Sequence, residues 1–245
     1  MKILLALALT LATAQAAELK VLSGNGARSA IAELGMQFER ASGHKVTIEF
    51  AVNPEVKKRI DAGEAFDVAV LNPPVLDALI KEGKVLRATR SVIGRAGIGA
   101  AVREGAPKPD ISTVEAFKRA LLSMNSVAYP GEGASGKYFV SVVERLGIAN
   151  EMKSRLRPMP AEYNVEVVAS GEVDMVVVVA SRIAGVNGVQ FLGGIPPELQ
   201  TWIGFAGGLG AKAREPEAAR ALLRFMTAPA AAAVLRKAGV EPFVE

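Results

Sequence analysis

The sequence contains no cysteine and a single histidine, His44. The absence of cysteine excludes disulfides, thiolate nucleophiles and metal sites with cysteine ligands. One histidine without cysteine also cannot build a Cys–His pair or a multi-histidine metal site, and His44 in its Ser-Gly-His-Lys turn does not suit a Ser–His–Asp triad. We therefore expect no metal, no cofactor and no catalytic residue, and we predict that the protein is not an enzyme.

Aromatic residues and clusters of one charge are also scarce. Aromatics make up 5% of the chain, and the formal net charge is +4, from 29 Lys and Arg against 25 Asp and Glu. Because the charges are scattered, the sequence argues against nucleic-acid binding, which favours a basic stripe. The low aromatic content argues against a sugar-stacking cleft, and the mild positive balance is compatible with a small anionic ligand.

The N-terminus resembles a signal peptide. Met1-Lys2 gives a positive start, residues 3–13 are almost wholly apolar, and Ala14-Gln15-Ala16 is a small-x-small cleavage site. The run is too short to span a bilayer; a membrane anchor or a buried first helix is the alternative. We predict cleavage near Ala16 and a periplasmic location for the mature chain.

Strand and helix patterns alternate along the chain and predict an α/β fold. In the first part, strands are predicted at 19–22, 46–52 and 66–71, and helices at 30–41, 54–62 and 75–81. In the second part, strands are predicted at 126–129 and 174–180, and helices at 112–124, 138–146 and 161–170, the first with Ser112 as N-cap and Glu115 in a capping box.

Two Gly/Ala-rich extended segments, 93–102 and 201–211, bracket the second part and are predicted to cross between two lobes. The predicted organisation is a signal peptide at 1–16, a discontinuous first lobe at 17–100 and 201–245, and a second lobe at 101–200. Each lobe is expected to be a mostly parallel sheet flanked by helices. Ligands of such folds bind at the carboxyl ends of strands, here in the cleft between the lobes.

A Ser-Gly-Asn-Gly-Ala-Arg turn joins the first predicted strand to its helix. Free amides at Asn25, Gly26 and Ala27, at the positive end of a helix, form a site for an anion, and Arg28 adds a fork of donors suited to a carboxylate. The alternative is a compact turn with a solvated Arg28. Ser29 stands where a dinucleotide fingerprint requires glycine.

A second glycine-rich loop, GEGASGKY, follows the strand at 126–129. It fits the phosphate loop of nucleotide-binding proteins until Tyr138, which replaces the Ser or Thr that would hold magnesium. Ser135, Gly136 and Lys137 still offer a hydroxyl, an amide and a charge to an anion; the alternative is an ordinary loop with a surface lysine.

Two further sites are candidates for the cleft. Asn53 either caps the helix that follows it or reaches the ligand. Tyr163 and Asn164 are expected to add hydrogen bonds from the second lobe, with a core position as the alternative for Tyr163.

Five stretches carry a resemblance to a known family: MQFERASGHKVTIEF, RIDAGEAFDVAVLNP, GASGKYFVSVVERLGI, VVASGEVDMVVVVAS and PEAARALLRFMTAPAAAAVLRKAGVEP. In their shared order they resemble the periplasmic molybdate-binding proteins and their divergent relatives, the class II solute-binding proteins of ABC importers. The resemblance implies two lobes joined by two crossing strands, closing over a ligand and presenting it to a membrane permease.

The residues that bind molybdate in that family are poorly matched at the corresponding positions of this sequence. Its ligand positions fall on Gly26, on Val52 or Asn53, on Val179, on Ser135, and near Ala161 and Glu162. Hydroxyl donors are thus lost, while Arg28 and Lys137 bring charges that such oxyanion sites avoid. We therefore favour a small organic carboxylate over a molybdate-type oxyanion.

The sequence predicts a monomeric periplasmic binding protein that delivers this anion to an ABC importer. The predicted ligand-binding residues are Asn25, Gly26, Ala27, Arg28, Asn53, Ser135, Gly136, Lys137 and Tyr163. Two alternatives remain open: a lyase or isomerase on the same scaffold, with Tyr163, Asp67 or Glu132 transferring a proton, and a ligand sensor for a membrane receptor.

Overall fold

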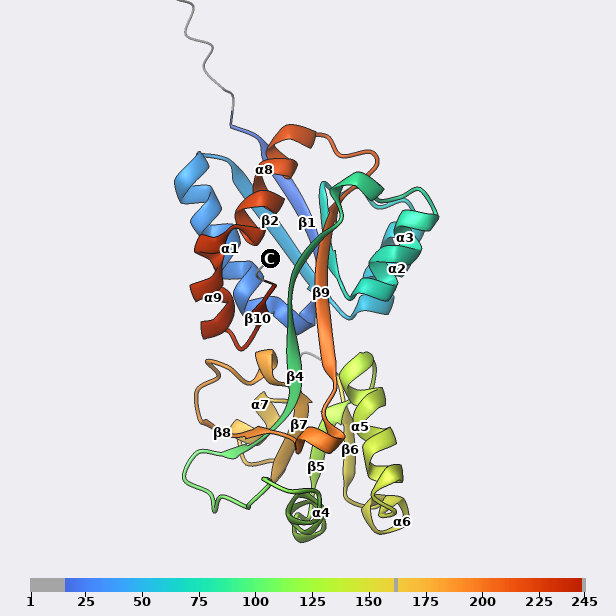
Figure 1. Cartoon of the computed structure of the whole chain (residues 1–245), viewed down its shortest axis with the longest axis vertical. Coiled ribbons are helices and arrows are strands. Elements are labelled where there is room, and N and C mark those ends of the chain that lie inside the picture. The colour runs from blue at the N-terminus through green and yellow to red at the C-terminus, as the bar shows by residue number, and fades with distance from the viewer. Residues whose placement is uncertain (1–15, 161–162, 244–245) are drawn as a thin grey trace, which may run out of the picture.

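A computed structural model describes residues 16–160 and 163–243, which form two lobes, one above the other in Figure 1. The predicted signal peptide lies outside the described residues except for Ala16, as do Ala161 and Glu162. The upper lobe contains β1 (Glu18–Gly24), α1 (Arg28–Ser42), β2 (Lys45–Ala51), α2 (Asn53–Asp61), β3 (Val68–Leu71), α3 (Pro73–Lys81), β9 (Trp202–Leu209), α8 (Pro216–Thr227), α9 (Ala232–Lys237) and β10 (Glu241–Pro242). The lower lobe contains α4 (Val114–Ser123), β5 (Val127–Pro130), α5 (Ala134–Arg145), α6 (Ala149–Met152), β6 (Leu156–Met159), α7 (Glu166–Ala169), β7 (Met175–Val179) and β8 (Val189–Gly194).

The strand β4 (Ser91–Arg103) runs through both lobes (Figure 1). Its first half pairs antiparallel with β9, and its second half pairs antiparallel with β7 and β8. The sheet order is β2-β1-β3-β9-β4-β7-β5-β6. β1 is parallel to β2 and β3, and β5 is parallel to β6 and β7. The predicted two-lobed α/β fold is confirmed, and the predicted lobe limits fall within β4 and just before β9.

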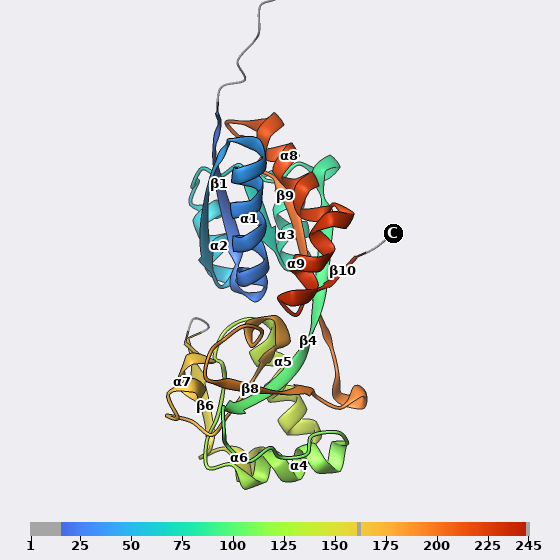
Figure 2. The ribbon, with the colours of Figure 1, turned by 90° about the vertical axis from the view of Figure 1, so that its left-hand side faces the viewer.

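Helices cover both faces of the upper sheet: α1, α8 and α9 lie on one side, and α2 and α3 on the other (Figures 1 and 2). The strands between them are therefore apolar on both sides, as in parallel sheets generally. In β7 every residue is buried, and alternate side chains face two different cores, with Val176 and Val178 in one and Met175 and Val177 in the other. Full burial of each such side chain stabilises the fold by about 1.5–3 kcal/mol.

Local predictions failed where the hydrophobic pattern was weak. Thr113, not Ser112, caps α4, because its hydroxyl accepts the Ala116 amide at 3.1 Å. The predicted helix at 161–170 is reduced to α7, and the short, partly exposed strands β6 and β8 were not predicted.

Over residues 16–160 and 163–243, no single helix is long and apolar enough to cross a membrane. The helix pair Pro216–Thr227 and Pro229–Lys237, bent by 56° between its members, meets these two criteria only when the two are taken together.

Candidate functional site

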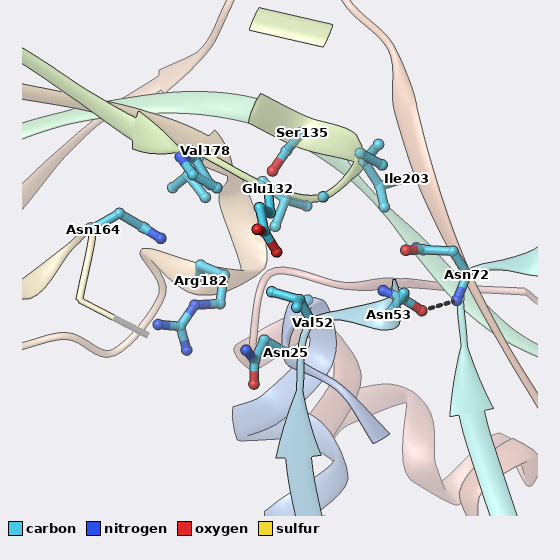
Figure 3. Close-up of a pocket in the computed structure, with 15 residues that line it drawn as sticks. Asn25, Val52, Asn53, Asn72, Glu132, Ser135, Asn164, Val178, Arg182 and Ile203 are labelled. Carbon is cyan, nitrogen blue, oxygen red and sulfur yellow. Dashed lines mark hydrogen bonds between the residues drawn. The ribbon is translucent and has the colours of Figure 1, made fainter. Parts of the chain in front are cut away.

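The carboxyl ends of the parallel strands of both lobes meet around one cavity of about 460 Å³, part of which opens to solvent (Figure 3). The cavity is lined by Asn25, Gly26, Val52, Asn53, Asn72, Pro130, Glu132, Gly133, Ala134, Ser135, Asn164, Val178, Val179, Arg182 and Ile203.

The turn after β1 supplies Asn25 from the 3₁₀ turn η1 (Asn25–Ala27). Arg28 does not enter the cavity. Its guanidinium stacks over Phe50, 4.5 Å from the ring centroid, and its Nη2 donates to Asn25 Oδ1 at 2.9 Å. Since Oδ1 of Asn25 accepts from Arg28, its Nδ2 faces the cavity, as Figure 3 shows. Arg28 therefore orients a donor of the site.

Two asparagines follow the next strands of the upper lobe. Asn53 is the first residue of α2, and it does not cap that helix; its Oδ1 accepts the backbone amide of Asn72 at 2.8 Å. Asn72 precedes α3, and its Nδ2 donates to the carbonyl oxygen of Gly204 at 2.8 Å. The Asn72 side chain is thus held against the crossing strand β9, and the Asn53 side chain is held against the backbone of Asn72.

The lower lobe contributes the loop between β5 and α5. The carboxylate of Glu132 and the hydroxyl of the buried Ser135 both point into the cavity (Figure 3). Gly133 has φ +95°, no side chain caps α5, and the first residues of this helix, Ala134 and Ser135, line the cavity. A Cβ at Gly136 would lie 1.7 Å from the carbonyl oxygen of Pro130, which shows that Gly136 serves the close packing of the loop.

Arg182 brings the positive charge to the cavity. It ends the 3₁₀ turn η3 (Ala180–Arg182) after β7, and only 11% of its side chain is exposed. Its Nη2 lies 3.9 Å from Glu166 Oε1, and Arg182 is one of the residues that line the cavity. Ser181, the preceding residue, donates from its hydroxyl to the Gly26 carbonyl oxygen at 2.5 Å and joins the two lobes.

The structure brings four of the predicted ligand-binding residues to the cavity wall and leaves five away from it. The four are Asn25, Gly26, Asn53 and Ser135, and the others are Ala27, Arg28, Gly136, Lys137 and Tyr163. Lys137 and Tyr163 are exposed, the latter at 61%, so the core alternative for Tyr163 is wrong. Binding of a ligand by the four residues stays a prediction.

Sequence reasoning missed Arg182 and Asn72, whereas Asn164, which it offered beside Tyr163, lines the cavity. A usable signal existed for Arg182, which follows the apolar run MVVVV in the same way that Arg28 follows the first strand.

The alternative proton donor Asp67 lies elsewhere. It is buried before the amino end of β3, where its Oδ2 accepts the Lys20 amide at 2.8 Å and its Oδ1 accepts the Arg214 amide at 2.7 Å. These bonds give Asp67 a structural role, and of the three alternative proton-transfer residues Glu132 alone lines the cavity.

A curated relative from a Pseudomonas species, named aconitate isomerase, is 35% identical over 246 residues, which cover 98% of this chain and 94% of the relative. This relative is named as an enzyme, so the prediction that the chain is not an enzyme is wrong. That prediction relied on missing histidine and cysteine sets, whereas one positioned carboxylate suffices for proton transfer.

The periplasmic molybdate-binding protein of Azotobacter vinelandii matches this structure with a TM-score of 0.78 at 20% identity, covering 92% of this chain and all of the other. The sulfate-binding protein SubI of Mycobacterium tuberculosis matches with a TM-score of 0.73 at 18% identity, covering 92% and 87%. The sequence pattern of the family described as bacterial extracellular solute-binding protein matches residues 19–241. The predicted resemblance to molybdate-binding proteins is confirmed, and the chain belongs to the bacterial extracellular solute-binding protein family.

Proposed function

We propose that this protein isomerises a small unsaturated polycarboxylate of the aconitate class in the cavity between its lobes. The observation that carries the proposal is that Glu132, a carboxylate, and Arg182, a buried cation, line the same cavity. The 35% identity to a protein named aconitate isomerase over nearly the whole chain supports the substrate class.

Binding of such an acid would use donors from both lobes. Arg182 brings a positive charge toward one carboxylate, and its burial limits screening by solvent. The hydroxyl of Ser135 and the first-turn amides of α5 suit a second carboxylate, and Asn25 adds a donor from the other lobe. Closure of the lobes would remove water and strengthen each of these bonds.

The proposed reaction moves a proton between the two ends of an allylic unit. Glu132 takes a proton from the methylene carbon next to the double bond, and the electron pair of that C–H bond spreads over three carbons and the attached carboxylates. Glu132 then returns the proton to the far carbon, so the double bond shifts by one position and the carboxylate is regenerated. Arg182 and the helix amides stabilise the charge that develops on the substrate carboxylates.

The test is isomerisation of trans-aconitate by the purified protein, followed by proton NMR. We expect the wild type to form cis-aconitate and Glu132→Gln to lose about 10²–10⁴-fold in kcat, the range for a positioned general base. Glu144→Gln, an exposed glutamate on α5 away from the cavity, is the matched control and should keep the wild-type rate. An inactive wild type, or full activity in Glu132→Gln, would overturn the proposal.

A second function of the same cavity is capture of the acid for an ABC importer in the periplasm, which the family match favours. This function includes the predicted signal peptide with cleavage near Ala16 and a membrane permease as partner. Uptake of a radiolabelled tricarboxylate by cells with and without the gene tests it separately from catalysis.

A further inference from the structure

The side-chain amide of Asn72 can face the cavity in one orientation only. A carbonyl oxygen accepts and cannot donate, so the atom that bonds the Gly204 carbonyl at 2.8 Å must be Nδ2. The other amide atom, Oδ1, points into the cavity (Figure 3). Asn72 therefore presents a fixed hydrogen-bond acceptor to a ligand.

Asn53 is fixed in the opposite sense. Its Oδ1 accepts the Asn72 backbone amide at 2.8 Å, which leaves Nδ2 as the atom turned to the cavity (Figure 3). Gly24 makes room for this arrangement, because a Cβ there would lie 2.8 Å from Asn53 Nδ2. Asn53 thus presents a donor next to the acceptor of Asn72, on the same wall of the upper lobe.

A neighbouring donor and acceptor do not suit a carboxylate alone. Among the described residues that line the cavity, both charged ones, Glu132 and Arg182, belong to the lower lobe, so the upper wall at Asn53 and Asn72 is neutral. A carboxylate is ionised above about pH 5 and only accepts, so it satisfies Asn53 but sets an oxygen against Oδ1 of Asn72. A hydroxyl group accepts from one residue and donates to the other.

We infer that Asn53 and Asn72 form a hydroxyl-recognition pair, so that hydroxylated tricarboxylates bind the cavity more tightly than tricarboxylates without a hydroxyl. The inference rests on the proposed function, because it takes a tricarboxylate as ligand. Such hydroxy acids are the hydrates of the unsaturated substrate, so they compete with it for the cavity and inhibit its isomerisation.

The test compares citrate with tricarballylate, two tricarboxylates that differ by one hydroxyl. Calorimetry on the wild type should give a citrate Kd about 10-fold lower, because two neutral hydrogen bonds together contribute about a factor of ten. In Asn72→Ala this ratio should fall to within about 2-fold while tricarballylate affinity is kept. Asn150→Ala, an exposed asparagine on α6, is the control and should keep the wild-type ratio.

The outcomes separate this inference from the proposed function. Equal affinities in the wild type, or an unchanged ratio in Asn72→Ala, overturn the hydroxyl pair, and a wild type that still isomerises trans-aconitate then leaves the proposed function standing. Failure of both acids to bind, together with absence of isomerisation, overturns both. Thermal melting checks each variant, and Asn53→Ala, which removes the donor instead, should lose the same ratio if Asn72→Ala does not fold.

Discussion

Replacement of Arg182 by glutamine should weaken tricarboxylate binding without unfolding the protein. The side chain of Arg182 lies at the cavity wall with 11% exposure, and one of its contacts is the 3.9 Å ion pair with Glu166, whose side chain is 52% exposed. Glutamine keeps part of the length and the polarity of arginine but removes the charge. Loss of the exposed pair with Glu166 should by itself cost at most about 1 kcal/mol of stability.

The expected loss of binding follows from the environment of the guanidinium. A carboxylate about 4 Å from a charge interacts by about 4 kcal/mol at an effective dielectric constant of about 20. Part of this is offset by desolvation, and a charge-assisted hydrogen bond measured by mutation contributes about 1.5–3 kcal/mol. A net value of about 3 kcal/mol corresponds to a Kd raised by about two orders of magnitude.

Calorimetry with tricarballylate measures this effect, because a saturated acid has no double bond to move. Lys137→Ala removes an exposed cation that does not line the cavity and should leave the Kd unchanged. The Kd of Arg28→Ala should lie between those of Arg182→Gln and Lys137→Ala, raised by about 10-fold or less. The reason is that Arg28 acts through a single hydrogen bond to Asn25. The melting temperature of Arg182→Gln should stay within about 4 °C of the wild type.

A Kd for Arg182→Gln within about threefold of the wild type would refute this reasoning, since about 0.7 kcal/mol is far below the interaction assigned to a buried charge. A larger effect from Lys137→Ala than from Arg182→Gln would move the anion site to the outer face of α5. A wild-type protein that binds no tricarboxylate would contradict the ligand class itself.

Two further predictions concern stability. Gly136→Ala should lower the melting temperature by about 4–8 °C, as expected for about 2 kcal/mol of overpacking against the Pro130 carbonyl oxygen, and calorimetric melting measures it. Arg59 and Lys20 lower the pKa of Glu64 to about 2 from its usual 4.5. Between these two pKa values the unfolded state binds more protons than the folded state. The contribution of Glu64 to the free energy of unfolding is therefore present above pH 4.5 and is lost as the pH falls toward 2. Urea unfolding at pH 6 and pH 3 measures the decrease in the free energy of unfolding on acidification. This decrease should be about 1 kcal/mol smaller in Glu64→Gln than in the wild type, a value reduced for solvent screening.

The strands and helices that could be predicted are those with strong patterns. β3 and β7 are continuous apolar runs because helices or a second core cover both their faces, and such runs are visible in a single sequence. β6 and β8 could not be predicted, since partly exposed residues such as Arg157 and Phe191 give no alternation. Their strand conformation comes from pairing with β5 and β4, which is non-local.

The position of the site could be predicted, but the roles of its residues could not. The rule that ligands bind at strand carboxyl ends led to Asn25, Asn53 and Ser135, which line the cavity. The direction of Arg28 depends on Phe50, which a parallel neighbouring strand brings beside it, and local sequence contains no information on that contact.

The prediction that this protein is not an enzyme failed because it treated binding and catalysis as needing different residue sets. An allylic proton shift requires an acid-binding cavity, groups that stabilise developing negative charge, and one base. In the proposed function, the uncapped start of α5 and Arg182 would supply the first two. Glu132, in the loop just before α5, would add the third. Under the proposed function, a binding scaffold would gain isomerase activity through one added carboxylate, and a search for histidine or cysteine sets overlooks such a residue.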